Sequence, residues 1–323
     1  MEVLKMKKIV YTGEKDGAFK DTLGKTISGL VENRKDVVYL DADLMGCIGM
    51  VKYAKANPER CINVGIAESN MAGIAAGLAS EGFKPIIHSF GPFASRRCYD
   101  QVFLSAGYAG NPITIIGSDA GVCAAFNGGT HMPFEDVALY RALPEATVLE
   151  PTDTAMLENL LPQCMDLPGV KYLRMGRKNN MKVYETGSEF EIGKSVVLRE
   201  GKDAVIFACG IMIHEALQAA KTLAEEGIEV AVVDCYSIKP LDVETVMKYA
   251  TATGAVVVAE NHNRIGGLTS AVSEALIGKY AGTFEWVAVD DVFGEVGPQD
   301  YLQERFGLTA ANVVAKVKKA LGK

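Results

Sequence analysis

Short apolar runs alternate with amphipathic helical patterns along most of the chain, and this alternation limits the folds open to it. Runs such as VVYL and AVIFA suit buried strands, and the longer segments between them have helical periodicity. Strand–helix repeats of this kind predict an α/β fold with a mainly parallel sheet covered by helices. The expected strands are residues 37–40, 85–88, 113–116, 147–149, 171–173, 204–208, 230–233, 255–259 and 286–289. The expected helices are 68–78, 134–142, 214–226, 243–250, 268–280 and one from 310 onward.

A change of texture near residue 190 divides the pattern into two parts. The chain has 323 residues, which suits two domains better than one core. Residues 183–191, VYETGSEFE, are polar and rich in turn formers, so we expect a linker there. The predicted domains are residues 1–186 and 192–323. Ligands of parallel sheets bind at the carboxyl ends of strands, so the Gly-rich loop 117–131 is a candidate binding segment.

Charge and cysteine usage exclude several classes of protein. The formal net charge is −7, whereas nucleic-acid binders usually carry a basic surplus. The longest apolar runs are far too short to span a bilayer, and no apolar block of signal length follows MEVLKMKKIV. The seven cysteines are irregularly spaced, with no CxxC pair. This favours reduced thiols in a cytoplasmic protein over a disulfide framework or a metal site.

Glu68, in the segment VGIAESNM, opens a predicted helix among small and apolar neighbours. A glutamate at this position interacts favourably with the helix dipole and is usually solvated. A carboxylate held in an apolar pocket could instead bind the aminopyrimidine of thiamine diphosphate and so activate that cofactor. The spacing alone leaves both interpretations open.

Longer segments carry a resemblance to a known family. RCINVGIAESNMAGIAAGLASEGFKPIIHSF closely resembles the pyrimidine-binding domain of the transketolase family. EIGKSVVLREGKDAVIFACGIMIHEALQAA, YSIKPLD, ENHNRIGGLTSAVSEAL and VDDVFGEVG resemble its C-terminal domain. The similarity keeps its order over nearly the whole chain. The Gly-Asp-Gly of the family's metal-binding diphosphate domain does not occur in these 323 residues, so the chain resembles the separately encoded C-terminal subunit of a split transketolase.

The resemblance implies a function that needs a second chain. The expected activity is transfer of a two-carbon ketol unit from a ketose, such as a ketose phosphate, to an aldose, as in pentose phosphate metabolism. The expected cofactor is thiamine diphosphate with Mg²⁺ or Ca²⁺, and the metal ligands would come from the partner. That partner would be an N-terminal subunit with the diphosphate-binding domain, in an α2β2 heterotetramer.

The resemblance also assigns roles to individual residues. Glu68 matches the catalytic glutamate, and His131 matches a histidine that binds the sugar and moves protons. The residues expected around the cofactor are Glu68, Phe90, Phe93, Asp43 and Leu44. Those expected around the substrate are Lys20, Asp43, Cys47, Asp119, Asn127, His131 and Arg177. In the second domain, His262 and the turn at Gly266 and Gly267 resemble structural or interface landmarks, with no chemistry assigned to them.

Several departures from the family pattern gather at the far end of the sugar. Lys20 stands where relatives carry an arginine, Asp119 where many carry a phosphate-binding histidine, and Asn127 where they carry an aspartate. Cys47 falls where many carry a serine. An added anion near a phosphate is unfavourable. The substrate could therefore be a sulfonated or branched sugar.

Other functions stay open at this stage. One alternative is half of another thiamine enzyme, either a deoxyxylulose-phosphate synthase or the beta subunit of a 2-oxoacid dehydrogenase. The remaining alternative is a non-catalytic scaffold subunit, which the presence of Glu68, Phe90 and His131 disfavours.

Overall fold

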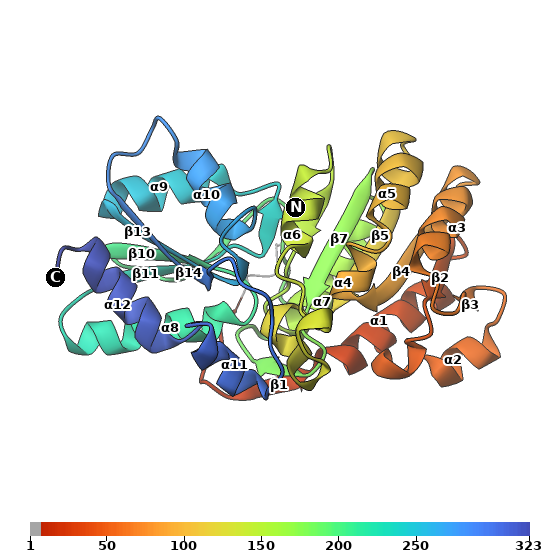
Figure 1. Cartoon of the computed structure of the whole chain (residues 1–323), viewed down its shortest axis with the longest axis horizontal. Coiled ribbons are helices and arrows are strands. Elements are labelled where there is room, and N and C mark those ends of the chain that lie inside the picture. Colours follow the sequence, from red (N-terminus) through yellow and green to blue (C-terminus); the bar gives the residue numbers. More distant parts are fainter. Residues whose placement is uncertain (1–7) are drawn as a thin grey trace.

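Two β-sheets, each covered by helices on both faces, divide the chain into two α/β units that lie side by side (Figure 1). The structure is a computed structural model that describes residues 8–323. Residues 1–7, which belong to the expected first domain and to the segment searched for a signal sequence, lie outside the described residues.

The first sheet has seven strands in the order β12-β6-β7-β5-β4-β2-β3. Its strands are β2 (Val37–Asp41), β3 (Cys61–Asn63), β4 (Lys84–Phe90), β5 (Ile113–Ser118), β6 (Thr147–Leu149), β7 (Val170–Met175) and β12 (Ser237–Lys239). All neighbours pair in parallel except β12, which runs antiparallel to β6. The second half of the chain therefore supplies one edge strand of the first sheet.

The helices of the first unit cover its sheet in two groups. They are α1 (Phe19–Asn33), α2 (Val51–Ala56), α3 (Glu68–Ser80), α4 (Gly91–Ala94), α5 (Tyr99–Gln101), α6 (Asp136–Ala142) and α7 (Thr154–Cys164). Short 3₁₀ segments η1 (Met45–Ile48), η3 (Gly121–Asn127) and η4 (Gly129–His131) and the π-helix η2 (Val102–Tyr108) complete the unit. Apolar side chains of α1 and α7 pack into one core, and those of α3, η2 and α6 pack into the other.

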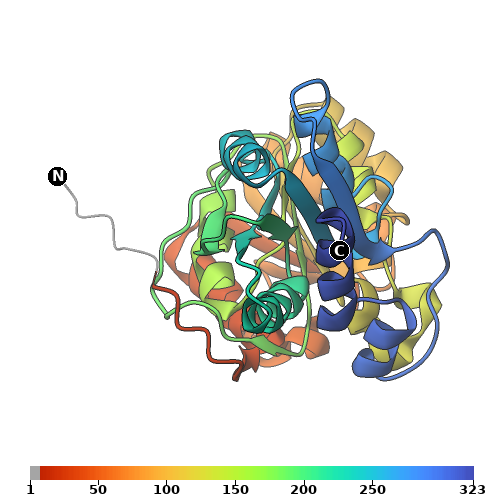
Figure 2. The ribbon, with the colours of Figure 1, turned by 90° about the vertical axis from the view of Figure 1, so that its left-hand side faces the viewer.

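The second sheet has the order β14-β13-β10-β11-β9. Its strands are β9 (Val196–Arg199), β10 (Ala204–Ala208), β11 (Val230–Asp234), β13 (Ala255–Asn263) and β14 (Thr283–Val289), and β9 alone among them pairs antiparallel. Its helices are α8 (Met212–Glu225), α9 (Val243–Thr253), α10 (Leu268–Leu276), α11 (Gln299–Arg305) and α12 (Ala310–Ala320). Helices α8 and α12 extend the core of α1 and α7, and α9 and α10 extend the other core; Figure 2 views the molecule from this second unit.

The predicted α/β architecture with a mainly parallel sheet is confirmed, although several element boundaries were wrong. The helix expected over 268–280 ends at Leu276, where Ile277 turns to an extended backbone, and the helix expected from 134 begins at Asp136. Elements α1, α2, α4, α5, α7, α11, β3, β9 and β12 were not predicted. The hairpin of β1 (Lys15–Ala18) and β8 (Asn179–Met181) was missed because its strands are far apart in sequence. Among residues 8–323, no helix has the length and apolar character that crossing a membrane requires.

A buried polar network joins the two units, and we call it the interdomain network. Arg174 is fully buried at its centre. Its Nε donates to Asp136 at 2.9 and 3.0 Å and one terminal nitrogen donates to Glu150 at 2.9 Å. The other terminal nitrogen donates to the carbonyl oxygens of Pro133 at 3.1 Å and Asn261 at 2.8 Å. His262 lies beside it, with Nε2 3.7 Å from Asp136 Oδ1.

Candidate active site

The carboxyl ends of the parallel strands in the first sheet carry most of the predicted site residues. Because neighbouring strands of a parallel sheet end at the same edge, the segments that follow them are brought together. Asp43 and Leu44 follow β2, Glu68 follows β3, and Phe90 ends β4. Asp119 follows β5 and Arg177 follows β7. The fold thus places at one edge of the sheet residues that span most of the first unit's sequence.

Glu68 is the first residue of α3 and is only 1% exposed. Its carboxylate accepts hydrogen bonds from Ser89 Oγ at 3.3 Å and from one terminal nitrogen of Arg97 at 3.0 and 3.1 Å. The Arg97 side chain is 44% exposed and lies over the Phe93 ring, with its guanidinium carbon 4.0 Å from the ring centroid. Glu68 is therefore a buried carboxylate whose partner can move into solvent.

Aromatic rings lie close to this carboxylate. The centroids of Phe90 and Phe93 are 6.4 Å apart, and the His131 ring packs edge-on against them at 5.9 and 5.0 Å respectively. His131 Nδ1 lies 2.9 Å from Thr130 Oγ1, which fixes the ring orientation. Glu68, Phe90, Phe93 and His131, predicted from separate segments, thus form one cluster.

The loop after β2 has an unusual backbone that other side chains hold in place. Asp43 is exposed and adopts a left-handed conformation, with φ of +66°. Its N–H donates to Asn63 Oδ1 at 3.1 Å, and Asn63 Nδ2 donates back to its Oδ1 at 3.0 Å. The N–H of Leu44 donates to Asp41 Oδ1. Asn63 and Asp41 thus fix two of the residues expected around the cofactor.

A fully buried chain of polar side chains lies beneath this edge and was not predicted. His88 Nδ1 lies 2.9 Å from Asp41 Oδ2, and His88 Nε2 lies 3.1 Å from Ser118 Oγ. Tyr39 donates to the same Asp41 oxygen at 2.5 Å. This series of hydrogen-bonded side chains links the ends of β2, β4 and β5. Polar residues near the ends of otherwise apolar strands were the available sequence signal.

The residues predicted to bind the sugar tail meet at Arg177. Its Nε lies 3.2 Å from Asp119 Oδ1, and its guanidinium carbon lies 5.3 Å from the Phe90 centroid. The backbone N–H of Lys20 donates to the Arg177 carbonyl at 3.0 Å, so α1 begins beside it. Burial raises the pKa of the Asp119 carboxyl, and the charge of Arg177 partly opposes that shift.

Two predicted substrate residues are less closely tied to this cluster. Cys47 is half-buried in η1, and its backbone N–H donates to the Leu44 carbonyl at 2.8 Å. Asn127 ends η3 with its side chain exposed. Within residues 8–323, no side-chain hydrogen bond joins either residue to the other predicted site residues. Their predicted roles stay predictions.

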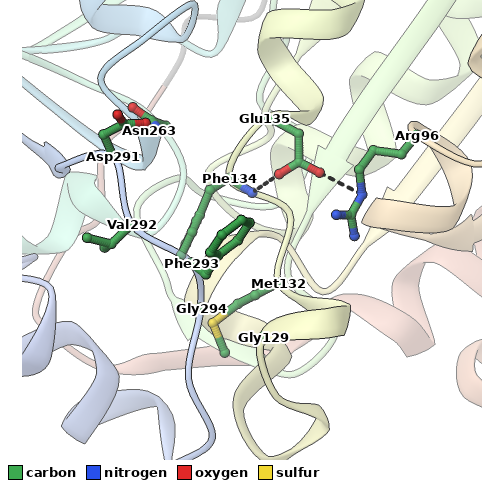
Figure 3. Close-up of a pocket in the computed structure, with 10 residues that line it drawn as sticks. All are labelled: Arg96, Gly129, Met132, Phe134, Glu135, Asn263, Asp291, Val292, Phe293 and Gly294. Atoms are coloured by element: carbon green, nitrogen blue, oxygen red, sulfur yellow. Dashed lines mark hydrogen bonds and ion pairs between the residues drawn. The ribbon is translucent and has the colours of Figure 1, made fainter.

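A cavity of about 490 Å³ opens beside the His131 segment, between the two units (Figure 3). One wall comes from the segment 129–135 and the other from the loop 291–294. Arg96 Nε lies 2.8 Å from Glu135 Oε1, and Glu135 also accepts the Phe134 N–H at 2.9 Å. Both units therefore line this cavity.

The residues at this edge fit one half of thiamine diphosphate. A buried carboxylate offers the hydrogen-bonding group that an aminopyrimidine nitrogen needs, and two phenylalanine rings offer flat apolar faces. No group of three or more His, Cys, Asp or Glu side chains in residues 8–323 is arranged to hold a metal ion.

Two family models together match most of the chain. Residues 16–182 match the transketolase pyrimidine binding domain, and residues 193–313 match the transketolase C-terminal domain. The two matched segments correspond to the two α/β units of the structure.

Individual relatives match over most of their length. A 6-deoxy-6-sulfo-D-fructose transketolase subunit from Clostridium sp. (strain MSTE9) is 46% identical over 91% of this chain and 92% of its own. One of the subunits of an apulose-4-phosphate transketolase from Phocaeicola vulgatus is 35% identical over 80% of this chain and 83% of its own. A solved split gene transketolase, described as an inactive beta4 tetramer, is 41% identical with a TM-score of 0.87, over 95% of this chain and 99% of that one.

Proposed function

The chain belongs to the transketolase family and is a transketolase-type transferase subunit, and from this premise we propose which of its residues perform each task in two-carbon transfer. Thiamine diphosphate, when bound, would supply the nucleophilic carbon that takes the two-carbon unit from a ketose and hands it to an aldose. The protein must bind and orient this group, hold the sugar, and move protons at its hydroxyls.

The main support for this proposal is Glu68, which is a buried carboxylate at the start of a helix beside two aromatic rings. We propose that its carboxyl group hydrogen-bonds the aminopyrimidine ring, with Phe90 stacking on the ring and Phe93 beside it. Asp43 and Leu44 would border the thiazolium. Arg97 now bonds both Glu68 oxygens, so it has to shift when the ring binds, and its exposed position permits that shift.

His131 is the proposed proton carrier at the sugar. Its Nδ1 faces Thr130 Oγ1, which leaves Nε2 to bond a sugar hydroxyl. Histidine is suited to accept and return a proton near neutral pH. Asp43 and Asn127 would bind further hydroxyls, and Lys20, Cys47 and Arg177 would contact an anionic tail, with Asp119 beside them. The relatives named for a sulfonated and a phosphorylated sugar support such a tail.

We propose that an N-terminal subunit completes the site. It would supply the diphosphate-binding domain and the ligands of Mg²⁺ or Ca²⁺, in an α2β2 heterotetramer. The match to separately encoded transketolase subunits supports a partner of this kind. The seven cysteines form no disulfide in the described part of the chain, which supports a cytoplasmic location.

Reconstitution tests this function. The chain is mixed with its N-terminal subunit, thiamine diphosphate and Mg²⁺, and ketol transfer is measured from xylulose 5-phosphate to ribose 5-phosphate and from erythrulose, a donor with no charged tail. We expect transfer from at least erythrulose by the mixture and none by either subunit alone. A complex that binds the cofactor but transfers from none of these donors would contradict the proposal.

A further inference from the structure

We call the proposed binding site for an anionic substrate tail, formed by Lys20, Asp119 and Arg177, the tail subsite. The ion pair between Asp119 and Arg177 determines its charge balance. Arg177 is the side chain best placed to bind an anionic tail, because it reaches from the end of β7 toward the Phe90 ring. Its Nε already lies 3.2 Å from Asp119 Oδ1. Part of the positive charge that would attract a substrate is therefore compensated within the protein.

Asp119 is held in this place by the fold. Its side chain is 1% exposed, and within the described part of the chain neither carboxylate oxygen has an aligned hydrogen-bond donor. Its backbone is left-handed, with φ of +61°, a conformation that aspartate and asparagine tolerate better than most residues. A buried carboxylate without donors is costly. Such a group at a predicted substrate site is a candidate for a role in recognition.

The charged and titratable groups around Asp119 offer limited compensation for a further anion. Besides Arg177, the groups that act on it are His88 beneath the edge and Lys178 at the surface, and its own charge acts on the thiol of the half-buried Cys123. Lys20 lies in the first turn of α1, beside Arg177, and its ammonium lies 4.0 Å from Asp21 Oδ1. The exposed Lys20–Asp21 pair is screened by solvent, whereas the Asp119 carboxylate beside Arg177 is buried.

We propose that Asp119, acting through Arg177, makes the subsite select ketoses whose tail carries a single negative charge, such as a sulfonate or a sulfate ester. This inference rests on the proposed ketol transfer. A singly charged tail can be balanced by the partly compensated Arg177. The second charge of a phosphate dianion would face the Asp119 carboxylate across a short distance, and like charges at such separations repel strongly when little water intervenes.

Two donors of the same shape and different charge test the proposal. Fructose 6-sulfate and fructose 6-phosphate share the sugar and the bridging oxygen, but the sulfate ester has one charge and the phosphate nearly two at pH 8. With the reconstituted complex, we expect kcat/KM for the sulfate to exceed that for the phosphate by about tenfold or more at pH 8. Erythrulose, with no charged tail, reports ketol transfer itself.

The variant Asp119→Asn removes the charge and keeps the shape and the backbone preference. We expect it to reduce the sulfate preference to within about threefold, mainly through a lower KM for the phosphate. Asp21→Asn is the matched control. It removes a surface charge that is 71% exposed, so screening should leave the preference as it is in the wild type.

A pH series on the wild type provides a second readout that does not depend on the variant. The second pKa of a phosphate ester is about 6, so lowering the pH from 8 to 6 turns much of the dianion into a monoanion. The sulfate preference should shrink several-fold, and protonation of Asp119 would act in the same direction. In Asp119→Asn the ratio should change little with pH.

The outcomes distinguish failure of the proposed charge selection from failure of the proposed ketol transfer. Loss of transfer from every donor, erythrulose included, would refute the proposed function. Transfer from erythrulose together with equal or better use of the phosphate at pH 8 would refute the charge selection. An unchanged preference in a folded Asp119→Asn complex would show that another residue sets it.

Discussion

Arg174 and Arg177 lie three residues apart in the segment YLRMGRK, yet they belong to two regions with opposite properties. Arg174, in the interdomain network, is fully buried and donates to two carboxylates and two carbonyl oxygens. Arg177, at the carboxyl end of the same strand, is 21% exposed and contacts Asp119 without an aligned hydrogen bond.

The contrast extends to the neighbours of each arginine. In the interdomain network, Asp136 and Glu150 are both bonded by Arg174, so their polarity is used within the protein. At the carboxyl edge of the first sheet, Asp119 is strained and lacks aligned donors, and Asp43 is strained and exposed. Polar groups that satisfy one another stabilise a fold, whereas groups left poorly satisfied are free to bind ligands.

Replacing each of the two arginines by lysine tests this comparison, because the two variants should have different effects. Arg174→Lys keeps the charge but cannot make all four contacts, so it leaves buried acceptors unpaired. We expect the free energy of unfolding to fall by roughly 3 kcal/mol, measured by denaturant titration. The variant Arg199→Lys, in a half-exposed pair with Glu229, is the control and should change it by less than about 1 kcal/mol. A stable Arg174→Lys protein would contradict the structural role.

Ionisation of the buried Asp234 should make the free energy of unfolding depend on pH. It accepts hydrogen bonds from Thr152 and Tyr184, and burial raises its pKa to about 7 from the ordinary 3.8. Between those values the folded state holds a proton that the unfolded state has lost, so stability is greatest below the lower value and falls as pH rises toward 7.

We expect the free energy of unfolding of the wild type to lose roughly 2 kcal/mol more than that of Asp234→Asn between pH 5 and pH 8. Thermal or denaturant unfolding at a series of pH values measures the two slopes. The comparison of slopes is independent of any constant loss of stability in the variant. Identical slopes would show that Asp234 ionises alike in both states.

Arg177→Lys should have the smallest effect, and on binding. Lysine keeps a charge for Asp119 but loses the planar guanidinium that grips an oxyanion. We expect KM for a ketose with an anionic tail to rise about tenfold, which is about 1.4 kcal/mol, with little change in the unfolding transition. Steady-state kinetics with charged donors and with erythrulose would show this. A rise in KM for erythrulose as well would mean that Arg177 supports the site generally.

The sequence was informative where local pattern determines structure. The apolar runs predicted the strands, and the rule that ligands bind at strand carboxyl ends pointed to the loop 117–131, whereas Glu68 and Phe90 were predicted as site residues from the family resemblance. The pairing of β12 with β6 could not be predicted, because a three-residue strand has almost no pattern of its own. The burial of Arg174 could not be predicted from its own segment, because it depends on residues distant in the chain, such as Asn261.

Some features of the site could not be predicted from the sequence, because they also depend on residues distant in the chain. The Glu68–Arg97 pair joins two segments that are far apart in the sequence, and the chain from Asp41 through His88 to Ser118 crosses three strands. The position of Arg97 four residues after Phe93, in the segment ASRRCYDQ, was the available hint.

The proposal that Glu68 activates thiamine diphosphate is tested most directly by the rate of hydrogen–deuterium exchange at C2 of this cofactor. The rate is measured by proton NMR on the complex with the N-terminal subunit. We expect fast exchange in the wild type and in Glu81→Gln, a control at the exposed end of the same helix, and at least about a hundredfold slower exchange in Glu68→Gln with the cofactor still bound. Unchanged exchange in Glu68→Gln would contradict the claim that this chain supplies the carboxylate that activates the cofactor.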